Sequence, residues 1–245
     1  MKTGEDHKFA LVTGGNSGIG YATAKLLKKR GYEVTITGRD LGRVSEAAQK
    51  LGVEFHIADI GSFDAMKELA SKFHNTGLDV LVNNAAIARF IPITAHTGED
   101  YREFLDCNIH GPMLLIQGLI PALEKRNGAI TSISSAITQN GLPNASLYAA
   151  TKGALEAMSK SLAIELAPLG IRANVVSPGA IDTPILNKLG LTEEQVSVIK
   201  SQQETQIPMN RYGNAFEVAD VIVAQLEASY VTGALWTVDG GIDAM

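Results

Sequence analysis

Seven short segments of the chain consist almost entirely of apolar and β-branched residues. They cover residues 9–13, 33–37, 53–58, 79–82, 129–133, 172–177 and 234–238. Apolar residues follow one another in these segments and do not alternate with polar ones, which is typical of strands covered on both faces. The pattern therefore predicts seven strands in the interior of the molecule.

The stretches between these segments have the spacing of amphipathic helices. In residues 19–30 the side chains of Ile19, Leu26 and Leu27 fall on one side, and lysines and an arginine fall on the other. Gly31 follows, where a glycine commonly ends a helix. Strands that alternate with helices form a parallel sheet with helices over both faces. We therefore predict an α/β fold, a doubly wound seven-stranded parallel sheet, in one domain over residues 1–245.

One segment, residues 184–210, departs from this alternation. It is long for a connection and rich in leucine, isoleucine and valine. Long connections in compact domains are often lids over a binding site. We expect a partly helical substrate lid over this range, with Phe90, Ala136, Ile137 and Leu142 lining the same apolar pocket.

Small and polar residues gather directly after the predicted strands. The first strand is followed by a run of glycines, the fourth by Asn83 and Asn84, and the fifth by Ser134 and Ser135. Open α/β sheets bind their ligands at the carboxyl ends of the strands. The coincidence of these clusters predicts a ligand site at that edge of the sheet.

The link between the first strand and the first helix contains Gly14, Gly18 and Gly20 in the spacing GxxxGxG. Glycines there permit a tight turn and a close approach of the backbone to a pyrophosphate, and the helix N-terminus offers free N–H groups. An ordinary glycine-rich turn is the alternative interpretation. The β-α-β pattern around the glycines favours a dinucleotide site over that alternative.

The residues after the second strand bear on the choice of cofactor. An acidic residue here accepts a hydrogen bond from the ribose 2′-hydroxyl of NAD, whereas this chain has Gly38 followed by Arg39. A guanidinium suits a 2′-phosphate, so we predict NADP(H) in preference to NAD(H). If the strand ended elsewhere, Asp40 would take the place of the acid and NAD(H) would be possible. We favour the other interpretation of Asp40, the N-cap of the following helix.

Tyr148 and Lys152 are four residues apart in a predicted helix and therefore share one helical face. A free tyrosine has a pKa of about 10, and a nearby ammonium lowers it. We expect Lys152 to bring the pKa of Tyr148 toward neutrality, where the phenol can act as a general acid or base. The alternative is a surface pair that merely shares a helix, but Ser135, at the end of an earlier strand, favours a catalytic group.

Composition and charge exclude several classes of protein. The net charge is −5 and the hydrophobic content is 45%, which argues against nucleic-acid binding and against disorder. No apolar run approaches the roughly 18 residues of a membrane span, and the N-terminus lacks a signal-peptide pattern. The one cysteine, Cys107, fits a reducing compartment and is predicted to be a packed thiol. We expect a cytoplasmic protein with no membrane partner and, from the histidine spacing, no metal site.

Taken together, the motifs resemble the short-chain dehydrogenase/reductase family of the compact single-domain type, over essentially the whole chain. The resemblance implies a Rossmann-like fold, an NAD(P)-dependent oxidoreductase and a homo-oligomer, either a tetramer or a dimer. Ala86 stands where the family usually has glycine. The motifs that carry the resemblance are Thr13-Gly14-Gly15-Asn16-Ser17-Gly18-Ile19-Gly20, Asn83-Asn84-Ala85-Ala86, Asn108, Ser135, Tyr148-x-x-x-Lys152, Pro178-Gly179, Tyr230-Val231-Thr232-Gly233 and Asp239-Gly240-Gly241.

The resemblance also implies a role for each site residue. Tyr148 would exchange a proton with the substrate oxygen, and Ser135 would hydrogen-bond the same oxygen. Lys152 would bind the nicotinamide ribose and lower the pKa of Tyr148, and Asn108 would anchor a water that links Lys152 to solvent. Asp59 and Ile60 would lie beside the adenine, Asn84 on the adenosine side, and Ile181 and Thr183 at the nicotinamide carboxamide. The full set of implied cofactor-binding residues is Gly14, Asn16, Ser17, Gly18, Ile19, Gly20, Arg39, Asp59, Ile60, Asn84, Tyr148, Lys152, Ile181 and Thr183.

Relatives that reduce carbon–carbon double bonds commonly space the tyrosine and the lysine more widely. We therefore predict hydride transfer between NADP(H) and a ketone or secondary alcohol of a small, largely apolar substrate. The alternatives are an NAD-dependent alcohol dehydrogenase, a nucleotide-sensing binding protein on the same fold, and an isomerase, epimerase or dehydratase that oxidises its substrate transiently. Such binding proteins typically lack the tyrosine or the lysine, and such isomerases carry an enlarged C-terminal substrate domain; neither feature is expected here.

Overall fold

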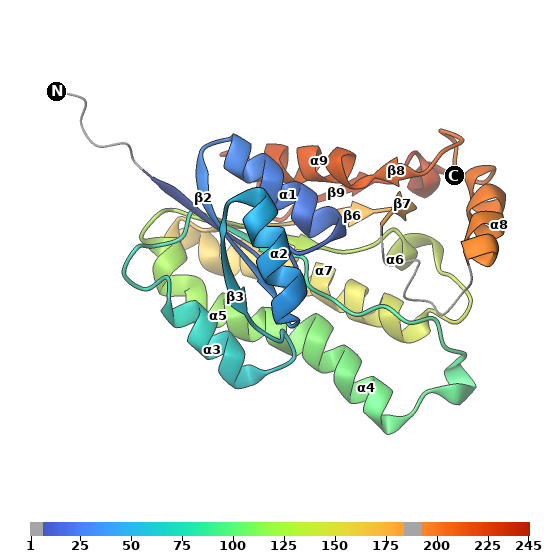
Figure 1. Ribbon diagram of the computed structural model, residues 1–245, viewed down its shortest axis with the longest axis horizontal. Coiled ribbons are helices and arrows are strands. Elements are labelled where there is room, and N and C mark those ends of the chain that lie inside the picture. The colour runs from blue at the N-terminus through green and yellow to red at the C-terminus, as the bar shows by residue number, and fades with distance from the viewer. Residues whose placement is uncertain (1–6, 184–192) are drawn as a thin grey trace.

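The computed structural model describes residues 7–183 and 193–245 of the chain. In this part of the chain a seven-stranded sheet lies at the centre, and all of its strands are parallel (Figure 1). The prediction of a doubly wound parallel sheet is confirmed, and each predicted segment contains most of an observed strand. In spatial order the strands are β3 (Glu54–Ile57), β2 (Tyr32–Gly38), β1 (Lys8–Val12), β4 (Val80–Asn83), β5 (Ala129–Ile133), β6 (Arg172–Pro178) and β9 (Leu235–Val238).

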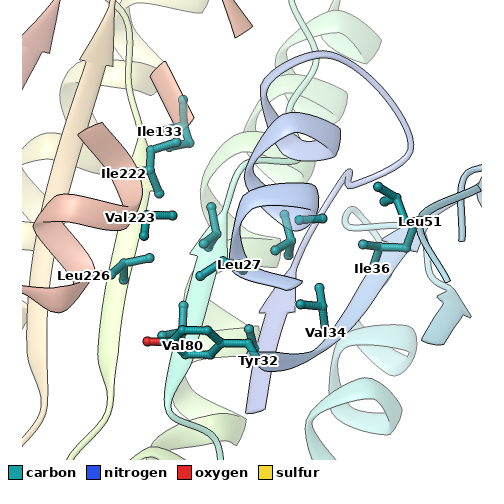
Figure 2. Close-up of a cluster of buried hydrophobic side chains, with 14 of the residues drawn as sticks. Leu27, Tyr32, Val34, Ile36, Leu51, Val80, Ile133, Ile222, Val223 and Leu226 are labelled. Carbon is teal, nitrogen blue, oxygen red and sulfur yellow. The ribbon is translucent and has the colours of Figure 1, made fainter. Parts of the chain in front are cut away.

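One face of the sheet is covered by α1 (Gly18–Lys29), α2 (Leu41–Leu51) and α9 (Ala215–Glu227). Figure 2 shows the buried side chains that fill this layer, among them Leu27 of α1, Val34 of β2 and Ile222 of α9. Leu27 and Ile222 are completely buried. The helices therefore attach to the sheet through a continuous apolar layer.

The opposite face is covered by α3 (Phe63–Ser71), α5 (Gly111–Glu124) and α7 (Ser146–Leu166). Neighbouring residues of one strand serve the two layers in turn: Ala10 and Val12 of β1 belong to the first apolar cluster, and Leu11 belongs to the second. Both faces of a strand must then be apolar. This arrangement explains why the strands appear in the sequence as unbroken apolar runs.

The predicted ends of α1 and α2 are close to those observed. Arg30 follows the last residue of α1, and Gly31 has a φ of +88°, as a glycine after a helix end commonly has. Asp40 is the N-cap of α2, and its Oδ1 accepts a hydrogen bond from the backbone N–H of Arg43 at 2.9 Å. The interpretation of Asp40 as a helix cap is confirmed.

Two features of the fold were not predicted. A π-helical turn, Asp106–His110, joins α4 (Gly98–Leu105) to α5, although the apolar spacing across these residues suggests one unbroken helix. A second, two-stranded parallel sheet pairs β7 (Ile181–Asp182) with β8 (Gly213–Asn214). Cys107 of the π-helical turn and Thr183, the residue after β7, both line a cavity at the carboxyl edge of the main sheet.

The predicted lid over residues 184–210 falls partly outside the described residues. Its described part contains α8 (Glu193–Glu204). The other short helices of the described residues are α6 (Ile137–Asn140), Ile93–Ala95, Ala167–Leu169 and Ile242–Ala244. Across the two described ranges, no helix has both the length and the apolar character needed to cross a membrane.

Candidate active site

The glycine-rich loop after β1 has a shape that side chains would prevent. Gly14 and Gly18 have φ values of +64° and +54°, in the left-handed region that favours glycine. A Cβ on Gly14 would lie 3.1 Å from the Cα of Ala85, and a Cβ on Gly20 would lie 2.5 Å from the carbonyl oxygen of Gly14. The loop therefore packs closely against the end of β4 and against the first turn of α1.

Asn84 and Thr13 brace this loop. The hydroxyl oxygen of Thr13 accepts hydrogen bonds from the backbone N–H groups of Asn84 and Ala85, both at 3.0 Å. The side-chain Nδ2 of Asn84 donates to the carbonyl oxygens of Thr13 at 2.9 Å and Gly14 at 3.2 Å. The side-chain amide of Asn84 thus fixes the glycine loop, and its contact with an adenosine stays a prediction.

A cavity of about 610 Å³ opens at this edge of the sheet, between the ends of β1, β2 and β4. Ser17 forms no capping hydrogen bond, and α1 begins at Gly18 with no acidic side chain in its first turn. The N–H groups of this turn are therefore available to an anionic group such as a pyrophosphate. The predicted cofactor residues that line the cavity are Gly14, Asn16, Ser17, Gly18, Ile19, Arg39, Asp59, Ile60, Asn84 and Thr183.

Other predicted cofactor residues lie outside the cavity lining. Gly20 is buried beneath the loop that it packs against. The side chain of Ile181 is 8% exposed, belongs to the first apolar cluster and lies against Gly213 of β8. The structure therefore gives Gly20 and the side chain of Ile181 packing contacts, and a ligand contact of either residue stays a prediction.

Arg89, Glu103 and Cys107 line the cavity although sequence reasoning did not select them as cofactor residues. Arg89 forms ion pairs with Glu103 at 2.6 Å and with Asp100 at 3.3 Å. Its position shortly after β4, at the ligand edge of the sheet, was the signal that could have identified it. Cys107 is 6% exposed, and burial raises the pKa of its thiol to about 11, which agrees with the prediction of a packed, unreactive thiol.

Three of the four predicted catalytic residues lie where β5 ends and α7 begins. Ser135 follows β5, and Tyr148 and Lys152 lie one turn apart on α7. The Nζ of Lys152 lies 5.7 Å from the centroid of the Tyr148 ring and donates a hydrogen bond to the carbonyl oxygen of Ile133 at 2.7 Å. Lys152 is 5% exposed, so the protein holds this amine inside the structure in one position.

The π-helical turn positions Asn108. Its Oδ1 accepts from the backbone N–H of Ile87 at 2.9 Å, and its Nδ2 donates to the carbonyl oxygen of Ile87 and to the hydroxyl of Thr151, both at 3.0 Å. Asn108 is 2% exposed. It therefore ties the loop after β4 to the helix turn that carries Lys152.

The expectation that Lys152 lowers the pKa of Tyr148 is wrong for the side chains that the structure describes. Burial raises the pKa of Tyr148 to about 12, and a hydrogen bond with Ser135 opposes that rise only in part. Burial also lowers the pKa of Lys152 to about 8, while the charge of Glu156 opposes that change. Burial is therefore the largest influence on the pKa of each group, and it disfavours the charged form of both.

Comparison with known proteins assigns the family. A family model described as Enoyl-(Acyl carrier protein) reductase matches residues 14–243. Carbonyl reductase family member 4 of Xenopus tropicalis is 35% identical over 241 residues, which cover 96% of this chain and 98% of that protein. The 3-oxoacyl-(acyl-carrier-protein) reductase FabG of Thermotoga maritima is 35% identical over 245 residues, which cover 96% of this chain and 97% of that protein.

Solved structures agree with this assignment. A 3-ketoacyl-(acyl-carrier-protein) reductase from Brucella melitensis, complexed with NADH, superposes with a TM-score of 0.88 at 28% identity, covering 98% of this chain and 100% of that chain. A variant of ElxO with NADPH bound superposes with a TM-score of 0.89 at 29% identity, with the same coverage. The family and the class of enzyme predicted from the sequence are confirmed. The chain belongs to the short-chain dehydrogenase/reductase family of NAD(P)-dependent oxidoreductases.

Proposed function

We propose that this protein transfers a hydride between NADP(H) and a ketone or secondary alcohol of a small, largely apolar substrate. The observation that carries the proposal is the convergence of Ser135, Tyr148 and Lys152 where β5 ends, beside a cavity built around the glycine loop. A phenol and a hydroxyl that face one oxygen suit a carbonyl group. The carbonyl carbon then accepts a hydride while its oxygen accepts a proton.

The residues of the chain divide this work. The nicotinamide cofactor supplies or accepts the hydride when bound. Tyr148 donates its proton to the carbonyl oxygen during reduction, and Ser135 hydrogen-bonds that oxygen and orients it. Lys152 binds the nicotinamide ribose, and Asn108 holds the turn of α7 next to Lys152 and anchors the water that leads to solvent. Because burial raises the pKa of Tyr148 to about 12, the phenol keeps its proton at neutral pH and is suited to act as the acid.

The preference for NADP(H) rests on Arg39. Arg39 follows β2, is exposed, lines the cavity and has no ion-pair partner in the described ranges 7–183 and 193–245. Asp40, which would hold the ribose of NAD, is engaged as the N-cap of α2. A guanidinium that has no ion-pair partner in the described ranges favours a 2′-phosphate.

A carbonyl panel tests the proposal. With NADPH in the cuvette, apolar ketones are expected to lower the nicotinamide absorbance, and α,β-unsaturated thioesters are not. The second substrate class is included because the matching family model is described as Enoyl-(Acyl carrier protein) reductase. Reduction of the unsaturated thioesters alone would contradict carbonyl chemistry, and tight NADPH binding without turnover of any substrate would favour a nucleotide-sensing protein.

An aromatic wall stands beside the candidate proton donor. The ring of Phe90 lies edge-on to the ring of Tyr148, with centroids 6.4 Å apart, and is 38% exposed. The backbone N–H of Ile91 donates to the carbonyl oxygen of Asn144 at 2.8 Å, which fixes the Phe90 loop to the loop before α7. Leu142 is 44% exposed on that second loop. These side chains support an apolar substrate.

Replacing Phe90 by alanine is expected to raise KM for an apolar ketone about tenfold, since a lost aromatic contact costs about 1 kcal/mol or more. The affinity for NADPH is expected to stay within about twofold of that of the unmodified protein, because Phe90 does not line the cofactor cavity. Steady-state kinetics and fluorescence titration measure the two quantities. Phe216→Ala is the matched control, since Phe216 is 48% exposed on α9. An equal rise of KM in both variants would refute a contact between Phe90 and the substrate.

Two further parts of the proposal concern the lid and the assembly. We infer that residues 184–210 cover the substrate. In the described part, Lys200 of α8 pairs with Asp182 of β7 at 2.5 Å, which holds α8 beside the site.

We also infer a homo-oligomer, a dimer or a tetramer. The support is a set of exposed apolar side chains on α4, α5 and α7, namely Leu105, Met113 and Ile164.

A further inference from the structure

Glu156 is a buried carboxylate on the helix that carries the candidate catalytic residues. It follows Tyr148 and Lys152 at successive intervals of four residues, so all three lie along one face of α7. Glu156 is 9% exposed. A carboxylate removed from water is costly unless hydrogen bonds or an opposite charge compensate for the loss of hydration. The neighbours of Glu156 supply both.

Two hydroxyl groups bond to Glu156 from the segment around Ser135. The Oγ of Ser134 donates to Oε1 of Glu156 at 2.5 Å, and the Oγ1 of Thr138 lies 2.9 Å from the same oxygen. The Thr138 hydroxyl also lies 3.0 Å from the carbonyl oxygen of Ser135. Ser134 and Thr138 flank Ser135 in the chain, so Glu156 fastens both sides of the turn that presents the Ser135 hydroxyl.

The charged groups around Glu156 come from two elements. On α7, Glu156 raises the pKa of the Lys152 ammonium against the larger effect of burial, which lowers it to about 8. From the helix Ile242–Ala244, Asp243 faces Glu156; burial, then Asp239 and Glu156, raise the pKa of Asp243, while a hydrogen bond from Asn140 at 2.6 Å opposes them. Lys152 is the opposite charge in this group, and Asp243 and Asp239 carry the same sign as Glu156.

We propose that Glu156 is a positioning residue of the reaction: its carboxylate is the buried counter-charge of the Lys152 ammonium and fastens the turn that carries Ser135. The inference rests on the proposed function, since it assigns work to Lys152 and Ser135 in ketone reduction. Glu156 itself contacts neither the substrate nor the cofactor. It acts through the residues that do.

Glu156→Gln tests the counter-charge, because it removes the charge and keeps the size of the side chain. The pH profile of kcat/KM for ketone reduction should fall on the basic side as Lys152 loses its proton, near pH 8 in the unmodified protein. Without the carboxylate, the ammonium loses its proton more easily. The basic limb is therefore expected to move to lower pH by about one unit. Glu165→Gln, on an exposed position of the same helix, is the control and should leave the limb in place.

A measurement on Lys152 itself separates this inference from the proposed function. Acetylation of Lys152 by acetic anhydride, followed by mass spectrometry across a pH series, reports when the amine is free. The pH of half-maximal labelling is expected to fall in Glu156→Gln by about the same amount as the kinetic limb. If no ketone is reduced by the unmodified protein, the proposed function fails while labelling still tests the effect of the Glu156 charge on Lys152. A labelling profile that does not change in Glu156→Gln would overturn the counter-charge.

Thr138→Val tests the fastening of the turn, and it also serves if Glu156→Gln does not fold. Valine keeps the shape of threonine and removes the hydroxyl that bonds to Glu156. We expect kcat to fall about threefold to tenfold, the effect of one lost hydrogen bond, with the basic limb of the pH profile unchanged. An unchanged kcat in Thr138→Val would overturn the fastening role.

Discussion

Replacing Tyr148 by phenylalanine is expected to lower kcat for ketone reduction by about 10²- to 10⁴-fold, the usual contribution of a positioned general acid. The change removes one hydroxyl and keeps the ring that packs edge-on against Phe90. It also leaves the glycine loop and the cavity lining untouched, because Tyr148 is not part of that lining. NADPH affinity should therefore stay near that of the unmodified protein. Stopped-flow kinetics and a fluorescence titration measure the two quantities.

Tyr101→Phe is the matched control for this experiment. Tyr101 lies on α4 and is 40% exposed, so removing its hydroxyl should change neither kcat nor NADPH affinity. Retained turnover in Tyr148→Phe would refute Tyr148 as the proton donor. A parallel loss of turnover and of NADPH binding would show instead that the hydroxyl supports the cofactor site and not the proton transfer alone.

The sheet was predictable because each strand has to satisfy two apolar layers. Ala10 and Val12 serve one layer and Leu11 the other, so the alternation that marks a half-buried strand disappears and a continuous apolar run remains. The candidate site was predictable for a related reason. Parallel strands bring their carboxyl ends to one edge, so the glycines after β1, Arg39 after β2 and Ser135 after β5 meet there without any knowledge of the helices.

The features that escaped prediction depend on contacts between distant segments. The π-helical turn at Asp106–His110 adds a residue to one turn, which the apolar spacing of a single sequence does not reveal. Glu156 looks like an ordinary helix residue until Ser134 and Thr138 are placed against it. The pKa of Tyr148 rises for the same reason: spacing along a helix shows that Lys152 is near, but only packing shows how far both groups are removed from water.

Replacing Arg39 by aspartate is expected to weaken NADPH binding by about 10²-fold or more and to leave NADH binding nearly unchanged. Two effects add: the charge-assisted hydrogen bonds to a 2′-phosphate are lost, each contributing about 1.5–3 kcal/mol, and a carboxylate now faces the dianion. NADH has a 2′-hydroxyl at this position, and this hydroxyl can donate a hydrogen bond to the new carboxylate. Isothermal titration with both cofactors measures the two dissociation constants.

Two alanine variants separate a direct contact from a general effect of positive charge. Arg39 lines the cavity, whereas Arg43, in the first turn of α2, is exposed and does not line it. Arg39→Ala should weaken NADPH selectively, and Arg43→Ala, which removes the same charge from the neighbouring helix, should change NADPH binding little at physiological salt. Equal losses for NADPH and NADH in Arg39→Ala would contradict a 2′-phosphate contact. Asp40, which caps α2, would then be the side chain to replace next, because it is the acid beside Arg39 that could select the ribose of NAD.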